Sequence, residues 1–366
     1  MAIGIFGLPQ TGKTTIFNAV TRGHADTASF RTGTTQPNIG IAKVPDIRLS
    51  KLAEISKPKK VIPAEVEYFD VPMTPDGTGK TKGIGGEYLN VLQRCEALLM
   101  VCRAFDDPAV PHTEDTIDPY RDVTALEFEL MFSDLAILEK REQRISTQLR
   151  SAKVTERDGL QREQKLIVDI RTKLEEEVPV REQKLPLEAW PLLENFQLLS
   201  AKPLMIVFNV DEGSVGDIEL IEGELASKLN RANVLTGVIC GKLEMELAQM
   251  TPEEESEFRE SLGAGEPGLD RMVRLSYDLL GLISFLTTGP DETRAWTIRK
   301  GMSALEAAGK IHSDIQRGFI RAEIVGYDDL IRTGGIPEAR KQAVLRTEGK
   351  TYVMQDGDVV NFLHNT

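Results

Sequence analysis

The residues with the clearest chemical potential form a glycine-containing segment that ends in a lysine and a threonine. The segment from Gly7 to Thr14 reads G-L-P-Q-T-G-K-T, which has the G-x-x-x-x-G-K-[ST] spacing of a phosphate-binding loop. An apolar run over 2–6 precedes it, and apolar positions with helical spacing follow it. A glycine-rich turn can match this spacing by chance, but the strand-to-helix context favours a nucleoside triphosphate site.

The residue types in this loop can bind phosphate groups, neutralise their charge and hold a metal ion. Glycines let the backbone curl so that successive N–H groups face the phosphates, at the positive end of the following helix. Lys13 is predicted to neutralise the β and γ phosphates in binding and catalysis, and Thr14 to place its hydroxyl on Mg²⁺. The residues expected around the phosphates are Gly7, Leu8, Pro9, Gln10, Thr11, Gly12, Lys13, Thr14 and Thr15.

Further metal and base contacts are expected downstream. Asp70 closes the strand-like run 65–70, where P-loop enzymes place the carboxylate that holds the Mg²⁺ water shell, although such an aspartate can also simply begin a turn. Thr34 or Thr35, after the first helix, is a candidate for reaching the metal. Base recognition is expected at the end of a later strand, in 207–212.

The composition is typical of a globular chain with several domains. At 366 residues and 41% hydrophobic content, the chain can bury more than one core. It has no apolar run near the ~18 residues that a membrane helix requires, so we expect a cytoplasmic protein without membrane contacts. Its three cysteines lack metal-binding spacing and are interpreted as reduced core residues. The net charge of −13 argues against a protein that coats nucleic acid, but it allows a local basic face.

Strand-like and helical runs alternate in the first third of the chain and return near residue 199. This alternation predicts an α/β fold in which a mostly parallel sheet has helices on both faces. The predicted domains are a P-loop domain in 1–122 and 199–282, a helical insertion in 123–198, and a small α+β domain in 283–366.

The insertion has the pattern of two long helices. Apolar residues recur at spacings of three, four and seven on both sides of a polar interruption, with dense mixed charges between them. These positions are Met131, Leu135, Leu138, Ile145, Leu149, Leu160, Ile167, Ile170 and Leu174. An antiparallel hairpin of the coiled-coil type, with one narrow apolar seam, fits this pattern best. Its charged faces are either simply solvated or a surface for RNA or protein.

These features resemble the YchF-type, or Obg-like ATPase, family in the Obg branch of P-loop GTPases. The resemblance covers nearly the whole chain and is strongest in 266–271, 294–298, 318–323, 327–329 and 353–358. The last of these segments resembles the TGS domain, a ubiquitin-like β-grasp module. The resemblance implies a P-loop domain with an inserted helical hairpin and a C-terminal TGS domain, and it favours Thr34 as the switch threonine.

The base-recognition segment departs from the GTPase pattern. GTPases carry Asn-Lys-x-Asp, whose aspartate accepts two hydrogen bonds from guanine. The corresponding residues here are Asn209, Val210, Asp211 and Glu212. Glutamate is one methylene longer and misplaces the carboxylate, and each buried polar group left unpaired costs ~1–3 kcal/mol. The resemblance therefore implies a preference for ATP over GTP. It also implies a turn that contacts the base, formed by Cys240, Gly241 and Lys242.

Catalysis raises two further points. The family has Asp-x-x-Gly after the metal-binding strand, but Met73 here replaces the glycine whose N–H meets the γ-phosphate. The family relies on a loop histidine to position the attacking water, and His112 occupies the matching place. Without the resemblance, a lone loop histidine would be interpreted as a surface residue.

We therefore expect a P-loop NTPase that uses ATP or GTP with Mg²⁺, favours ATP, and acts as a nucleotide-dependent switch. Slow turnover is expected because no arginine finger is evident in the chain. The resemblance implies the ribosome, its subunits or tRNA as partners, reached through the helical insertion and the TGS domain. The alternatives are a nucleotide-gated binding protein without hydrolysis, because of Met73, and an ordinary GTPase, which Glu212 disfavours.

Overall fold

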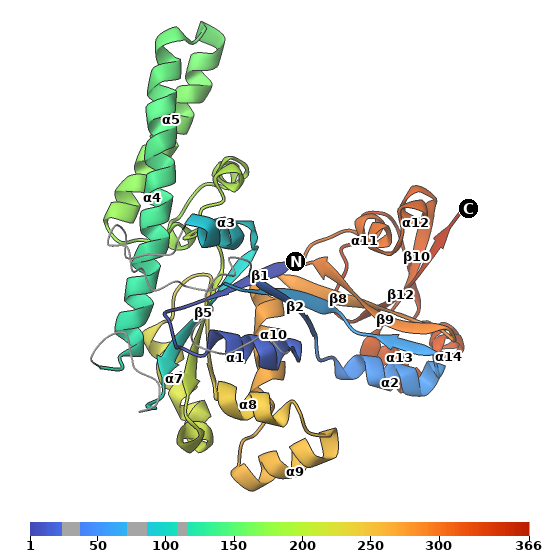
Figure 1. Cartoon of the computed structure of the whole chain (residues 1–366). Helices are drawn as coiled ribbons and strands as arrows, with labels where there is room; N and C mark the ends of the chain where they lie inside the picture. The colour runs from blue at the N-terminus through green and yellow to red at the C-terminus, as the bar shows by residue number, and fades with distance from the viewer. Residues whose placement is uncertain (24–36, 72–85, 108–115, 366) are drawn as a thin grey trace. The chain divides into compact units, whose positions relative to one another are not determined.

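The computed structural model describes residues 1–23, 37–71, 86–107 and 116–365. The chain divides into two compact units, one of residues 1–40 and 67–269 and one of residues 41–66 and 270–366. Figure 1 shows the strands and helices of both. Each unit is built around one six-stranded sheet, and the two are described in turn.

The first unit is built on a sheet with the strand order β2-β4-β1-β5-β6-β7. Its strands are β1 (Ala2–Phe6), β2 (Asn38–Lys43), β4 (Glu65–Asp70), β5 (Ala97–Ala104), β6 (Leu204–Val210) and β7 (Val234–Ile239). The pairs from β4 through β7 are parallel. Because continuous apolar runs need cover on both faces, β5 and β6 are buried along almost their whole length. This sheet confirms the predicted α/β class.

The shorter helices of the first unit are α1 (Lys13–Thr21), α3 (Gly86–Arg94), α6 (Trp190–Leu193), α7 (Ile218–Lys228), α8 (Gly241–Leu247) and α9 (Pro252–Leu262). The range 241–262 forms two helices, α8 and α9, and not one continuous helix. Thr251 caps a new helix by accepting from the backbone N–H of Glu254, and Pro252 occupies its first position. The cap formed by Thr251 and Glu254 therefore starts a separate helix at Pro252.

A long helical hairpin, α4 (Pro119–Ser151) and α5 (Val154–Glu175), extends away from the sheet (Figure 1). Its seam buries Leu138, Ile145, Ile167 and Ile170, at positions that the sequence pattern predicted. Across the seam, Arg141 pairs with Glu163. In the part of the chain that the structure describes, no helix, including these two, is long and apolar enough to cross a membrane.

The first turns of α4 belong to the core of the sheet. Val123, Leu126 and Leu130 pack in the same apolar cluster as Met100 and Phe208 of β5 and β6. The predicted start of the insertion at residue 123 therefore lies inside a continuous helix. Proline is well tolerated in the first turn of a helix, which explains why α4 begins at 119 rather than after the proline.

Buried charges attach α4 to the segment that returns to β6. Asp134 accepts hydrogen bonds from the backbone N–H groups of Leu199 and Ser200, both at 2.7 Å. Burial raises the pKa of Asp134 to about 6, although these donors oppose the shift. Glu127 lies 3.2 Å from Arg181, which is buried as well. These contacts fix the base of the hairpin.

The second unit has a sheet of order β11-β10-β12-β8-β9-β3. Its strands are β3 (Lys60–Ile62), β8 (Leu282–Thr288), β9 (Glu292–Arg299), β10 (Phe319–Gly326), β11 (Arg346–Glu348) and β12 (Asp358–His364). Its helices are α2 (Ile47–Ser56), most of α10 (Gly268–Leu279), α11 (Ala304–Ile311), α12 (Ser313–Arg317), α13 (Tyr327–Thr333) and α14 (Ile336–Lys341). Outside these strands, Val353 forms a single antiparallel bridge with Ser303.

Residues 41–66 group with the second unit, whereas the predicted domains placed them in the P-loop domain. The strand β3 pairs in parallel with β9. Arg48 of α2 donates to Asp356 at 2.7 Å, and Asp356 accepts from the backbone N–H of Ser284 at 2.9 Å. The grouping rests on contacts between residues far apart in the chain, which local sequence spacing does not encode.

The buried Asp134 carboxylate predicts a large stability effect. Replacing Asp134 by Asn leaves one acceptor and turns an amide donor toward a backbone N–H, so Asp134→Asn is expected to lower the free energy of unfolding by roughly 1–3 kcal/mol. Urea denaturation measures this change. The matched control is Asp158→Asn on the exposed surface of α5, expected within about 0.5 kcal/mol of the unaltered protein. Equal effects of both substitutions would contradict the role given to Asp134.

Candidate nucleotide-binding site

The predicted phosphate-binding loop joins β1 to α1 in a tightly packed conformation. Gly12 precedes α1 with a φ of 88°, in the left-handed region, and no side chain caps the helix there. A Cβ on Gly12 would lie 2.2 Å from Nδ2 of Asn209, and one on Gly7 would lie 2.3 Å from the carbonyl oxygen of Val101. Both positions therefore require glycine. A helix N-terminus without a side-chain cap suits an anion.

Lys13 is buried inside the loop. Its Nζ donates to the carbonyl oxygen of Leu8 at 2.7 Å, and Thr11 Oγ1 donates to the same oxygen at 3.1 Å. Burial lowers the pKa of Lys13 to about 8, and the negative charge of Asp70 opposes this shift. A phosphate group next to Lys13 would favour its charged form.

The structure brings Thr14 and Asp70 together. Thr14 Oγ1 donates to Oδ2 of Asp70 at 2.9 Å, and Asn38 Nδ2 donates to the same oxygen at 3.1 Å. The other oxygen, Oδ1, is buried and has no hydrogen-bond partner. A buried carboxylate oxygen without a partner, beside a hydroxyl group, fits a hard cation such as Mg²⁺ or one of its waters.

The protein alone supplies few ligands for such a cation. Within the described ranges, no group of three or more His, Cys, Asp and Glu side chains could hold a metal ion. Mg²⁺ commonly binds through one or two protein ligands together with substrate phosphates and water. Thr14 and Asp70 therefore fit a cation that binds together with a triphosphate.

Two residues of this region were not assigned a role from the sequence. Asn38, at the start of β2, holds the Asp70 carboxylate; its position directly after the expected switch segment was the available signal. Arg103, near the end of β5, is fully buried and donates to the carbonyl oxygens of Phe105 and Asp107 at 3.1 and 3.4 Å. Nothing in its apolar strand pattern marked this arginine.

Arg103 supports the start of the segment that leads to a predicted catalytic residue. Its guanidinium lies 4.6 Å from the ring centroid of Phe105, in addition to its hydrogen bonds to the same loop. His112 itself lies outside the described residues, as do Thr34 and Met73.

Asn209 connects the phosphate loop to the predicted base-contacting turn. Its Nδ2 donates to the carbonyl oxygen of Thr11 at 3.0 Å, and its Oδ1 accepts from the backbone N–H of Gly241 at 2.9 Å. The end of β6, the loop and the start of α8 are thereby held in one fixed arrangement. The side chain predicted to recognise the base thus also positions the loop.

The remaining predicted base contacts divide into two groups. Glu212 and Lys242 form an ion pair, with 2.8 Å between Oε1 and Nζ. The side chains of Val210 and Cys240 are instead buried in the apolar core of the sheet, where burial raises the pKa of the Cys240 thiol. Val210 and Cys240 can therefore offer a base only their backbone atoms.

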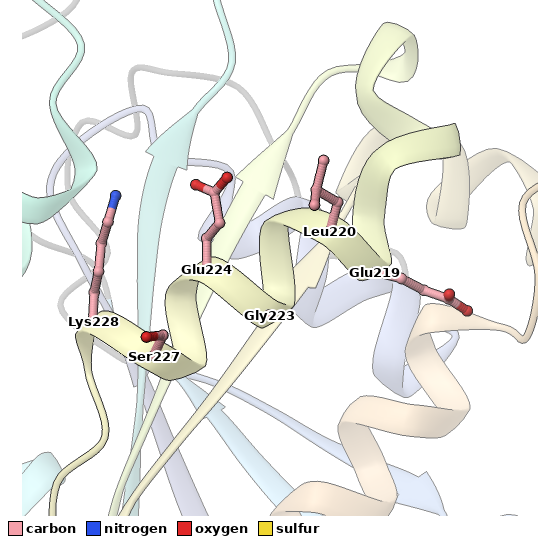
Figure 2. Close-up of a pocket in the computed structure, with 6 residues that line it drawn as sticks. All are labelled: Glu219, Leu220, Gly223, Glu224, Ser227 and Lys228. Atoms are coloured by element: carbon pink, nitrogen blue, oxygen red, sulfur yellow. The ribbon is translucent and has the colours of Figure 1, made fainter.

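A separate hollow runs along the exposed face of α7. Figure 2 shows its lining, formed by Glu219, Leu220, Gly223, Glu224, Ser227 and Lys228. No atom lies within 4 Å of the place where a Cβ of Gly223 would be, so the hollow is a gap in the row of side chains. It shares no residue with the phosphate loop or the predicted base contacts.

Two family models match parts of the chain. Residues 2–140 match the family MMR_HSR1, described as "50S ribosome-binding GTPase". Residues 282–365 match the family YchF-GTPase_C, described as "Protein of unknown function (DUF933)". The first match contains the phosphate loop, and the second covers most of the second unit.

Similarity to whole proteins extends over nearly the full length. The chain is 40% identical to "Ribosome-binding ATPase YchF" of Bacillus subtilis, with 100% of this chain and 99% of the relative covered. It is 35% identical to the protein of the same name from Escherichia coli O157:H7, with 99% and 98% covered. The solved structure of the Schizosaccharomyces pombe YchF GTPase matches with a TM-score of 0.86 at 30% identity, with 99% of this chain and 97% of the other covered. Together with the phosphate loop and its buried lysine, these similarities show that the chain belongs to the YchF family.

Proposed function

We propose that this protein binds ATP with Mg²⁺, hydrolyses it slowly, and binds the ribosome in a nucleotide-dependent manner in the cytoplasm. The observation that carries the proposal is the phosphate loop, in which Lys13 is buried beside Asp70 and an uncapped helix N-terminus follows Gly12. The relatives from Bacillus subtilis and Escherichia coli support it, because both are called ribosome-binding ATPases.

The residues of the loop have distinct roles in this proposal. Backbone N–H groups at the start of α1 and the ammonium group of Lys13 bind and orient the phosphates. Thr14 and Asp70 would hold Mg²⁺, and Thr34 from the switch segment would supply a third ligand. The cation supplies charge neutralisation for the β and γ phosphates. His112 positions the attacking water, and Arg103 positions the segment that leads to it.

The preference for ATP is attributed to the base-contacting residues. The hydrogen bonds of Asn209 to Thr11 and Gly241, which hold the proposed base contacts next to the loop, support this assignment. Glu212 stands where GTPases have an aspartate, and its extra methylene misplaces the carboxylate and weakens the paired hydrogen bonds that guanine makes. Each guanine donor that loses its carboxylate partner costs ~1–3 kcal/mol of binding free energy. The loss of both hydrogen bonds is enough to reverse a preference for guanine.

In this proposal, nucleotide binding and ribosome binding are assigned to three different parts of the chain. The nucleotide-binding domain lies within 1–122 and 199–282, apart from residues 41–66 and 270–282, which group with the second unit; 123–198 form the helical insertion, and 283–366 form a TGS domain. The last two are proposed as the surfaces for the ribosome, its subunits or tRNA. In the second unit Arg317, Arg321, Lys341 and Arg346 are exposed, and basic side chains of this kind favour RNA phosphates.

Nucleotide titration tests the enzymatic part of the proposal. Calorimetric titration with Mg²⁺ is expected to give a Kd for ATP at least roughly tenfold below that for GTP, equivalent to about 1.4 kcal/mol. Single-turnover hydrolysis of the bound ATP is expected to be slow, and slower still in His112→Ala. The matched control is His364→Ala in β12, a substitution in the second unit.

Three outcomes would contradict parts of this proposal. GTP bound more tightly than ATP would identify an ordinary GTPase. Tight ATP binding without hydrolysis would identify a nucleotide-gated binding protein. Equal turnover in His112→Ala and the unaltered protein would remove the histidine from the mechanism.

The lowered pKa of Lys13 predicts a pH dependence of ATP binding. Phosphates raise this pKa in the complex, so above the free-state pKa of about 8 the complex holds more protons than the free protein. Affinity is expected to change little below about pH 8 and to fall toward tenfold per pH unit above it. Kd measured from pH 7 upward checks this expectation. The fall in ATP affinity above pH 8 should be absent in Lys13→Arg, because the guanidinium stays protonated. A Kd that stays constant with pH in the unaltered protein would contradict the role given to Lys13.

Sedimentation with purified ribosomes tests the partner. The chain is expected to co-sediment with ribosomes, with an affinity that falls as salt rises, because basic side chains displace counterions from RNA. Arg321→Glu should weaken binding, whereas Lys51→Glu on α2 is the charge-matched control. Absence of co-sedimentation at low salt, with ATP and without nucleotide, would exclude the ribosome as a direct partner.

A further inference from the structure

The carboxylate at the base site already has a partner within the protein. Glu212 follows the end of β6 and pairs through Oε1 with Nζ of Lys242, at 2.8 Å. The pairing with Glu212 raises the pKa of Lys242, so the lysine carries its charge at neutral pH. Both side chains are more than half exposed, at 52% and 68%, so they lie on the open rim of the site and not in the core.

The backbone around this pair is rigidly placed. Lys242 is the second residue of α8, next to Gly241, whose N–H donates to Asn209. Glu212 begins a short 3-10 helix whose preceding residue, Asp211, caps it by accepting from the backbone N–H of Ser214. The ion pair therefore joins two turns that are each fixed independently.

Adenine and guanine differ in the hydrogen bonds that they can form with the Glu212 carboxylate. Guanine presents two donors, N1–H and the 2-amino group, and its recognition requires a free carboxylate. Adenine has neither donor at these positions and therefore needs no hydrogen bond to the Glu212 carboxylate. Binding guanine would require the carboxylate to leave Lys242 or to share its lone pairs with it, whereas binding adenine leaves the pair intact.

We propose that Lys242 is a specificity-determining residue that disfavours guanine by holding the Glu212 carboxylate. This proposal rests on the proposed function, in which Glu212 faces the base. It adds a second cause to the length of the glutamate side chain, namely a competing intramolecular partner. The chemical class discriminated against is a purine with hydrogen-bond donors at N1 and C2.

A nucleotide panel measured on one substitution tests this proposal. In Lys242→Gln, the affinity for GTP relative to ATP is expected to rise by roughly two- to fivefold, the change that an exposed ion pair of this kind provides. ITP, which lacks the 2-amino group, should gain less than GTP. In the double variant Lys242→Gln and Glu212→Gln, the gain for GTP should disappear, because no carboxylate is left to release.

The control variant removes an equivalent charge elsewhere. Lys51 pairs with Glu54 at 3.0 Å on the exposed surface of α2, and Lys51→Gln should leave the ratio of GTP to ATP affinity unchanged. An equal loss of ATP and GTP affinity in Lys242→Gln would overturn the proposal, because the lysine would then contact the nucleotide itself. An unchanged ratio, or a gain that persists without Glu212, would overturn it as well.

This test separates the proposal from the function on which it rests. Failure of the proposed ATP preference would appear in the unaltered protein, as GTP binding at least as tight as ATP binding. The role of Lys242 is measured instead as the difference between variant and unaltered protein. A tight GTP complex in the unaltered protein would therefore overturn both, whereas an ATP preference that Lys242→Gln does not change overturns only the role of the lysine.

Discussion

The shape of the phosphate loop depends on the close packing of Asn209 against Gly12. The Asn209 amide donates to Thr11 and accepts from Gly241, and it occupies the space that any Cβ on Gly12 would need. One side chain thus sets the distance between the loop and the turn before α8. A buried amide with both of its ends hydrogen-bonded is costly to displace, so these two bonds stabilise the observed form of the loop. The placement of Lys13 follows from this arrangement.

The carboxylate of Asp70 connects the loop to the rest of the chain. It accepts from Thr14 at the start of α1 and from Asn38 at the start of β2. Beyond Asn38, β2 continues into residues 41–66, which belong to the second unit. The hydrogen bonds of Asp70 therefore hold the start of a strand that is covalently continuous with that unit.

The helical hairpin combines an apolar seam with a polar base. Along the seam, Leu138 and Ile170 are fully buried, and helical periodicity was sufficient to predict them. At the base, Asp134 and the pair of Glu127 with Arg181 are buried too, although charged residues in a helical pattern are normally interpreted as solvent-exposed. Their partners come from residues 181–200 and from Arg231, more than fifty positions away in the chain, so sequence spacing could not reveal them.

Local sequence by itself determined the phosphate loop, the α/β class and the hairpin seam, because glycine spacing, strand alternation and helical period are short-range properties of the chain. It also predicted that Thr14 and Asp70 share one metal site, because P-loop enzymes place a carboxylate at the end of a strand, and the two side chains are hydrogen-bonded in the structure. Only the tertiary structure decided that Asn38 shares the Asp70 carboxylate, that Arg103 is buried beneath its loop, and that Lys242 holds Glu212. These contacts join residues from different strands and turns, and the distance between such residues is set by how the sheet packs and not by their spacing along the chain.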